Sequence, residues 1–215
     1  RSYDLARPAC HLLNNSQLTV LCTDSGAVQL KRRDGCAPFV TRFEEQYEPS
    51  GVSFFFRETS GALYSLGGAP LWEEGHFGWQ FEGGEARWTI EEENFSAALR
   101  LTLPKYEVGA RWTVELKGAC QGELICYLEP MMAREADYFA HPAYSKLFIE
   151  SKPIENGVLF SRRPKSGKEK LALAVLWDKK ADGLDTSREK ALGRGGLRRF
   201  EQALEEPAKE SIGAV

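Results

Sequence analysis

The chain has 215 residues and a net charge of -3, with 28 Lys+Arg against 31 Asp+Glu. This balance gives no electrostatic basis for binding nucleic acid, and no apolar run approaches the roughly 20 residues of a membrane helix. The length suits one all-β domain, a class that commonly stays single at roughly 200–250 residues. The start of the chain has no apolar signal core. Because the first residue is not methionine, we expect a piece of a longer protein.

The cysteines and histidines predict neither a disulfide framework nor a metal site. The five cysteines are odd in number and form no C-x-x-C pair, whereas small secreted scaffolds are much denser in cysteine. We therefore expect free thiols in the reducing cytoplasm. The three histidines are scattered along the chain without the spacing of metal ligands, so we expect no metal and no bound cofactor.

Strand patterns with turn signals between them fill the first part of the chain. VSFFFRE (52–58) and ALYSLGG (62–68) flank a short loop, which predicts a hairpin. GWQFE (78–82) and ARWTIEEE (86–93) flank a Gly-Gly pair and predict a second one. Residues 97–103 and 111–117 then alternate apolar and polar side chains, the pattern of half-buried antiparallel strands.

The later segments continue this pattern and then change. ELICYLE (123–129) and LALAVLW (171–177) are apolar on both faces, which is typical of strands covered on both sides. Glu155-Asn156-Gly157 joins two further apolar runs, and Asn-Gly is the strongest short hairpin signal. Turn signals at this spacing indicate an all-β sandwich or barrel. We expect short helices only near the C-terminus, at residues 187–192 and 197–209.

Local motifs do not identify a catalytic residue. SRRPKSGK (161–168) has neither the first glycine nor the final Ser/Thr of a phosphate loop, so we interpret it as a solvated basic turn. Carboxylates are so numerous that the sequence nominates many pairs for glycoside chemistry and excludes almost none.

Two tryptophans in a glycine-rich segment are candidates for sugar contact. Trp72 and Trp79 lie in GGAPLWEEGHFGWQFEGG (67–84). Aromatic faces on loops with few constraints can stack on sugar rings. The alternative is that the rings fold back over the sheet as ordinary core residues.

The segment AHPAYSKLF (140–148) gathers four further candidates, His141, Tyr144, Ser145 and Lys146. Proline restrains the residue before it, so we predict a turn at His141 and a strand over residues 146–150. Side chains where a loop meets a sheet are well placed to reach a ligand or a neighbouring domain. Alternatively, His141 only caps local backbone groups and Tyr144 packs on the sheet.

ADYFAHPAYSKLFIES (136–151) resembles the A-x-x-x-A-H-P-A-[FY]-S-K-L-F segment in the sandwich domain of glycoside hydrolase family 94, formerly glycosyltransferase family 36. Within that family, the likeness is greatest to 1,2-β-oligoglucan phosphorylases and cyclic β-1,2-glucan synthases. Further segments resemble the family pattern in the same order: HLLNNSQLTVLCTDSG (11–26), VTRFEEQ (40–46), LFSRRPKS (159–166), TSREKALGRGG (186–196) and SIGAV (211–215). SGAVQLKRRDG (25–35) departs from it, because the family's G-G-G-Y-S-x-[WR] is absent.

The resemblance implies a galactose-mutarotase-like antiparallel supersandwich that stands ahead of an (α/α)6 helical barrel. In that family the barrel supplies the aspartate that protonates the glycosidic oxygen, while inorganic phosphate attacks the anomeric carbon with inversion. We therefore expect residues 1–215 to be a single, incomplete N-terminal sandwich domain with no catalytic residue of its own. The expected partners are a β-glucan oligosaccharide and the downstream barrel, and a second copy in a homodimer is a further candidate.

Three functions remain open at this point. The chain could brace the barrel and shape the glucan cleft of a phosphorylase or synthase. It could instead be a free-standing carbohydrate-binding module, or an assembly domain that does not contact sugar.

Overall fold

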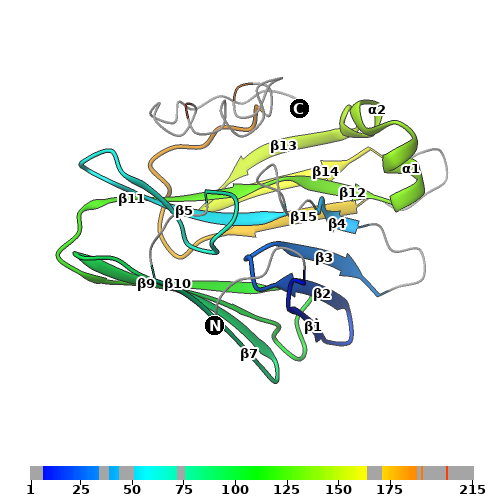
Figure 1. Ribbon diagram of the computed structural model, residues 1–215. Helices are drawn as coiled ribbons and strands as arrows, with labels where there is room; N and C mark the ends of the chain where they lie inside the picture. Colours follow the sequence, from blue (N-terminus) through cyan, green and yellow to red (C-terminus); the bar gives the residue numbers. More distant parts are fainter. Residues whose placement is uncertain are drawn as a thin grey trace. The chain divides into compact units, whose positions relative to one another are not determined.

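The computed structural model describes residues 7–33, 39–43, 51–71, 76–163, 171–187, 190 and 202. The chain divides into two compact units, Arg1–Glu129 and Pro130–Val215, which are described separately below. The described residues form fifteen strands and two short helices (Figure 1). This composition confirms the all-β class. That residues 1–215 make up one domain stays a prediction.

The first unit contains eleven strands, which belong to three antiparallel sheets. β1 to β4 follow one another in chain order, β7 to β10 form a four-stranded sheet in chain order, and β5 lies between β11 and β6. The strands are β1 (Cys10–Asn14), β2 (Leu18–Thr23), β3 (Val28–Arg32), β4 (Phe39–Thr41), β5 (Val52–Glu58), β6 (Leu63–Ser65), β7 (His76–Glu82), β8 (Glu85–Glu91), β9 (Phe95–Thr102), β10 (Arg111–Gly118) and β11 (Gly122–Leu128).

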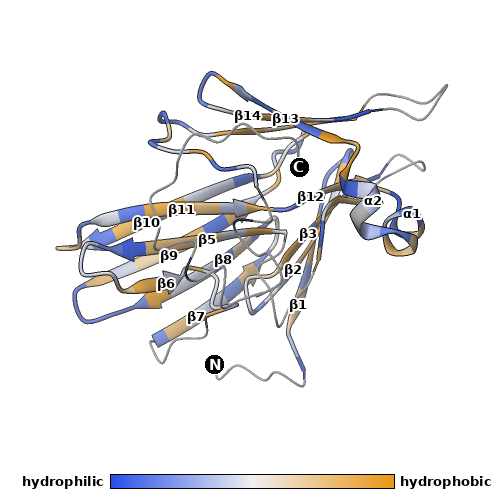
Figure 2. Cartoon of the chain, turned by 90° about the horizontal axis from the view of Figure 1, so that it is seen from above, coloured by the Kyte–Doolittle hydropathy of each residue, from blue (hydrophilic) through white to orange (hydrophobic). Residues whose placement is uncertain are grey.

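The alternating sequence of these strands places one face of each sheet in the core. In β8, Ala86, Trp88 and Ile90 are buried, while the residues between them are partly exposed. Leu99 and Leu101 of β9 face the same core from the neighbouring strand. Figure 2 shows the same alternation as bands of hydrophobic and hydrophilic colour along β7 and β10. Because side chains alternate between the two faces of a strand, this sequence pattern determines which face of the sheet is buried.

Contacts between the sheets make the first unit a sandwich. Phe95 of β9 packs against Phe56 of β5 and Tyr64 of β6, with ring centroids 5.1 and 4.9 Å away. The indole of Trp88 donates a hydrogen bond to the Thr23 carbonyl at 2.9 Å. The core therefore lies between the four-stranded sheet and the strands that face it.

Two predicted hairpins of this unit are confirmed. β5 pairs with β6 across the loop at residues 59–62, and β7 pairs with β8 across Gly83 and Gly84. The third, at Asn156, lies in the second unit, where β13 pairs with β14. Asn156 has φ 52°, the left-handed conformation that such tight turns require and that asparagine tolerates. Turn chemistry thus predicted all three connections.

A close approach of two backbones explains one glycine in the segment that departs from the family pattern. Gly26 has φ 81°, and a Cβ at this position would lie 2.4 Å from the Gly67 carbonyl oxygen. The nearby Ala69 amide donates to the Ser25 carbonyl at 3.0 Å. Only glycine fits this contact without moving one of the two turns.

The second unit begins with β12 (Pro130–Ala133), continues through two helices and ends in a three-stranded antiparallel sheet. The helices are α1 (Glu135–Ala140) and α2 (Pro142–Lys146), and both contact β12. The sheet has the order β13 (Ile149–Ile154), β14 (Gly157–Arg162), β15 (Leu171–Leu176). No helix among the described residues is long and apolar enough to span a membrane.

Two sequence expectations are wrong in this region. Helices occur at residues 135–146, ahead of the C-terminal segment to which we had confined them, and the strand predicted from Lys146 begins only at Ile149. The reason is that Pro142 occupies the first turn of a helix, where its fixed φ is favourable. The helices predicted at residues 187–192 and 197–209 lie almost entirely outside the described residues.

The two strands that are apolar on both faces are not covered on both sides. β11 and β15 each lie at an edge of their sheet, with Leu124 49% and Leu176 67% exposed. Continuous apolar runs therefore do not indicate burial here. The exposed apolar side chains instead belong to edge strands.

Candidate functional site

The candidates of the AHPAYSKLF segment lie together at the corner formed by α1 and α2 in the second unit. His141 is the residue between the two helices, with extended φ of -149° and ψ of 76°, and its side chain is exposed. Its carbonyl accepts a hydrogen bond from the Ser145 amide at 2.9 Å, which closes the turn of α2. His141 therefore ends one helix and begins the next.

Ser145 is the buried anchor of this corner. Only 4% of it is exposed, and it faces Arg162 at the end of β14. Arg162 Nη1 donates to the Ser145 carbonyl at 2.8 Å, and Nη2 donates to the Ser145 hydroxyl at 3.3 Å. Burial lowers the pKa of the Arg162 guanidinium, and the negative charge of Asp137 opposes this shift. A partly buried arginine thus holds α2 against the sheet.

Around this anchor, several side chains point to solvent. Tyr144 is 59% exposed and makes an edge contact with the Phe148 ring at 5.1 Å. Phe139 of α1 and Leu147 after α2 are also exposed large apolar residues, and Lys146 is half-buried. The corner therefore presents aromatic faces next to polar groups on a rigid support.

The structure brings together two segments that the sequence analysis treated separately. LFSRR (159–163) ends β14, and its Arg163 amide donates to the Phe148 carbonyl at 2.9 Å. The Arg163 side chain pairs with Glu150 of β13 at 2.9 Å. Two arginines near the start of the basic segment that we interpreted as a solvated turn, Arg162 and Arg163, therefore support the corner, while residues 164–168 lie outside the described residues.

Of the two tryptophan candidates, the structure describes only Trp79. Trp79 belongs to β7 in the first unit, where it packs against the core and contacts Phe81 at 5.1 Å. Its indole Nε1 is buried and has no hydrogen-bond partner among the described residues. Trp72 lies outside the described residues. Sugar stacking by either ring stays a prediction.

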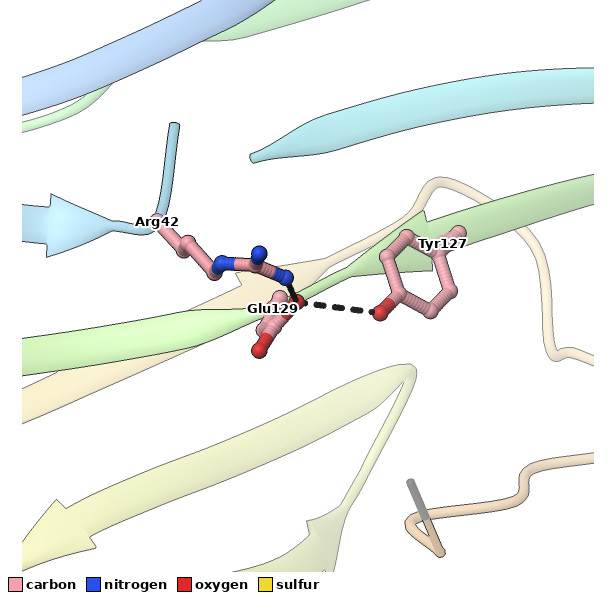
Figure 3. Close-up of polar contacts among 3 residues, drawn as sticks. All are labelled: Arg42, Tyr127 and Glu129. Carbon is pink, nitrogen blue, oxygen red and sulfur yellow. Dashed lines mark hydrogen bonds and ion pairs between the residues drawn. The ribbon is translucent and has the colours of Figure 1, made fainter. Parts of the chain in front are cut away.

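A second polar cluster, in the first unit, was missed from the sequence. Glu129 follows β11 and is 4% exposed. Its Oε2 accepts hydrogen bonds from Arg42 Nη1 at 3.2 Å and from the Tyr127 hydroxyl at 3.3 Å (Figure 3). The Arg42 amide also donates to the Glu129 carbonyl, at 3.1 Å. The signal for Arg42 was present in VTRFEEQ, but nothing marked Glu129 as its partner.

These two clusters differ in what they can do. The opposite charges of Arg42 and Glu129 form an ion pair at 3.2 Å. This pair links the ends of β4 and β11. The α1–α2 corner exposes the Tyr144 phenol and the His141 imidazole beside the half-buried Lys146, and such groups can stack on and hydrogen-bond to a polar ring such as a sugar. Among the described residues, no three His, Cys, Asp or Glu side chains gather closely enough to hold a metal ion.

Comparison with known proteins identifies the family of the chain but no individual relative. No curated protein matched the chain. The family model described as "Glycosyl hydrolase 94, supersandwich domain" matches residues 1–215. This match covers the whole chain and agrees with the antiparallel sheets described above. The chain therefore belongs to the supersandwich domain family of glycoside hydrolase family 94, and is a domain of a carbohydrate-active enzyme.

Proposed function

We propose that the chain is the sandwich domain of a cytoplasmic β-glucan phosphorylase or glucan synthase, of the kind represented by 1,2-β-oligoglucan phosphorylase and cyclic β-1,2-glucan synthase. Family membership over residues 1–215 supports the general assignment. The narrower assignment rests on the likeness of the sequence, within the family, to the sandwich domains of those two enzymes. The cytoplasmic part of the proposal rests on the sequence, because the five cysteines are odd in number and form no C-x-x-C pair.

In this proposal the α1–α2 corner forms part of the wall that meets the glucan. The carrying observation is that Tyr144, exposed to 59%, stands on a helix whose neighbouring Ser145 is buried and bonded to Arg162. A ligand-binding side chain on a fixed support loses little conformational entropy on binding. Tyr144 would stack on or hydrogen-bond to a glucosyl ring, and His141 and Lys146 would contact its hydroxyl groups.

The chemistry would be divided between this domain and a helical barrel. The barrel would supply the acid that protonates the leaving oxygen, and inorganic phosphate or a glucan hydroxyl would receive the glucosyl unit. The sandwich would brace the barrel and orient the glucan, and could also support a homodimer. It would act through binding and positioning, without a proton transfer of its own.

Glucose 1-phosphate release from β-1,2-glucan tests this division of labour. We expect release by the protein that joins this domain to its barrel, and none by the 215-residue chain alone, because proton transfer to the leaving group needs the general acid. Release that copurifies with the 215-residue chain would contradict the proposal. Tight glucan binding by a protein that has no barrel would instead favour a carbohydrate-binding module.

A further inference from the structure

We propose that Arg162 is a positioning residue that fixes the orientation of Tyr144 by holding the next residue, Ser145, and the Phe148 ring that contacts the tyrosine. The consequence for glucan binding rests on the proposed function, but the positioning itself rests only on contacts within the second unit. Arg162 does not lie in AHPAYSKLF. It reaches that segment from β14, 17 residues further along the chain.

The first contact runs through the backbone of α2. The Ser145 carbonyl lies in the last turn of this helix, where carbonyl groups have no partner within the helix. Arg162 Nη1 supplies that partner at 2.8 Å, and Nη2 reaches the hydroxyl of the same residue at 3.3 Å. Since Ser145 directly follows Tyr144, these bonds fix the backbone that carries the tyrosine.

The second contact runs through a ring. The guanidinium carbon of Arg162 lies 5.7 Å from the centroid of the Phe148 ring, within the range of a cation–π interaction. Phe148 in turn meets the Tyr144 ring edge-on at 5.1 Å, with an angle of 76° between the planes. Arg162 therefore restrains the tyrosine ring as well as its backbone.

Both contacts at once require the shape of arginine. Its planar fork can donate two hydrogen bonds while its face lies on an aromatic ring, whereas a lysine ammonium is a compact charge that cannot do both. Asp137 of α1 supplies a compensating negative charge. The guanidinium is therefore partly buried but remains charged, and its bonds to Ser145 are charge-assisted.

The expected consequence is preorganisation of Tyr144. An exposed tyrosine normally samples several rotamers and loses that freedom when it binds a ligand. Restraint of one such side chain is worth roughly twofold to tenfold in affinity. Loss of Arg162 should therefore weaken glucan binding by about this factor without removing any group that touches the sugar.

The positioning can be tested without sugar by ¹⁹F NMR of the chain labelled with 3-fluorotyrosine. The chain has seven tyrosines, and the resonance that disappears in Tyr144→Phe identifies Tyr144. We expect Arg162→Met to move that resonance toward the position of free fluorotyrosine and leave the other six in place. Arg162→Lys should give a partial shift, and this variant decides the question if Arg162→Met does not fold.

Arg163→Met is the matched control, because the neighbouring Arg163 pairs with Glu150 on the surface and reaches the corner through a bond of 3.4 Å to the Leu147 carbonyl, without contacting Ser145 in the described bonds. It should leave the Tyr144 resonance unchanged. A Tyr144 resonance that stays in place in both Arg162 variants would overturn the positioning role, as would an equal shift in the control.

A titration with β-1,2-gluco-oligosaccharide, carried out on the fluorotyrosine-labelled enzyme that joins this domain to its barrel, separates the two proposals. If the sugar moves the Tyr144 resonance, and twofold to tenfold more sugar is needed in Arg162→Lys, both the contact and the positioning are supported. If the sugar does not move the Tyr144 resonance, but the Arg162 variants still shift that resonance toward the position of free fluorotyrosine, the positioning role holds and the proposed glucan contact fails.

Discussion

The two arginine clusters of this chain use the same side chain for opposite purposes. In the first unit, Arg42 lies 3.2 Å from a carboxylate, and the two side chains are 20% and 5% exposed. In the second unit, Arg162 binds the neutral carbonyl and hydroxyl of Ser145, next to an exposed tyrosine. The first cluster pairs a buried carboxylate with an arginine, while the second holds the exposed Tyr144 in place.

This difference separates stability from function. Removing one partner of a buried ion pair leaves an uncompensated charge, which is among the most destabilising changes in a protein. Truncating an exposed side chain usually changes the free energy of unfolding only slightly. The Arg42–Glu129 cluster should therefore govern folding of the first unit, and the α1–α2 corner should govern ligand contact.

The largest expected effect is that of Arg42→Met. It removes the 3.2 Å ion pair between Arg42 and the buried Glu129 carboxylate, and we expect the free energy of unfolding to fall by about 3–5 kcal/mol, the usual loss when one partner of a buried pair is removed. Urea denaturation measures this change. Arg100→Met is the control, because its ion pair with Glu85 is more than one-third exposed and exposed pairs contribute about 0–1 kcal/mol.

A double variant sharpens this prediction. Arg42→Met combined with Glu129→Leu removes both charges, and such replacements are often neutral or stabilising. The double variant should thus be more stable than Arg42→Met alone. Equal losses in the double variant and in Arg42→Met would show that the charge pair is not what matters at this position.

The next effect is a pH dependence in the interior of the first unit. Burial raises the pKa of the Cys22 thiol from 9.0 to about 12, and the nearby Cys10 adds to the shift. Above pH 9 the unfolded chain loses this proton while the folded chain keeps it. The stabilising contribution is therefore complete below pH 9 and falls by about 1.4 kcal/mol per pH unit as the pH rises toward 12.

Cys22→Ala isolates this contribution from the other groups that titrate in alkali. The free energy of unfolding of the variant should depend less steeply on pH between 9 and 11 than that of the native chain. Parallel curves for the two proteins would show that the thiol is accessible to water in the folded state.

A smaller effect is expected from Ser145→Ala. This change removes the hydroxyl that accepts from Arg162 Nη2 but retains the carbonyl that accepts from Nη1. We expect a loss of about 1 kcal/mol, the usual net value of one hydrogen bond. A loss as large as that of Arg42→Met would mean that the corner is part of the core and not a support for an exposed side chain.

The sequence predicted the strands well because their signals are local. Alternation over residues 97–103 and 111–117 corresponds to the paired strands β9 and β10, and Asn156 forms the predicted turn. Each of these features depends on residues that are close in the sequence, either through the alternation of apolar and polar side chains or through the residues of one turn. A single strand or hairpin can therefore be inferred without knowing what lies across the core.

The sites were harder because their partners are distant or their signals are ambiguous. Glu129 lies 87 residues from Arg42, and a glutamate at the end of an apolar strand ordinarily faces water. His141-Pro142 is equally compatible with a turn before a strand and with the start of a helix as short as α2. The residues of the corner were recognised through resemblance, whereas the support by Arg162 became visible only in three dimensions.

The smallest expected effect on stability is that of Tyr144→Phe, because the exposed hydroxyl should change the free energy of unfolding by no more than about 0.5 kcal/mol. Lys146→Met should also leave the fold intact. His141→Ala separates two roles, since loss of stability with normal kinetics would mean that this histidine only joins the two helices. Thermal denaturation of the three variants checks these expectations.

The most direct test of the glucan contact is kcat/KM for β-1,2-glucan phosphorolysis in the enzyme that joins this domain to its barrel. For Lys146→Met we expect kcat/KM to fall about tenfold to hundredfold, the value of one hydrogen bond that involves a charged group, and for Tyr144→Phe about twofold to tenfold, the value of one neutral hydrogen bond. The melting temperature of both variants should be unchanged. Native kcat/KM in both variants would contradict the account and leave the α1–α2 corner without a role in substrate handling.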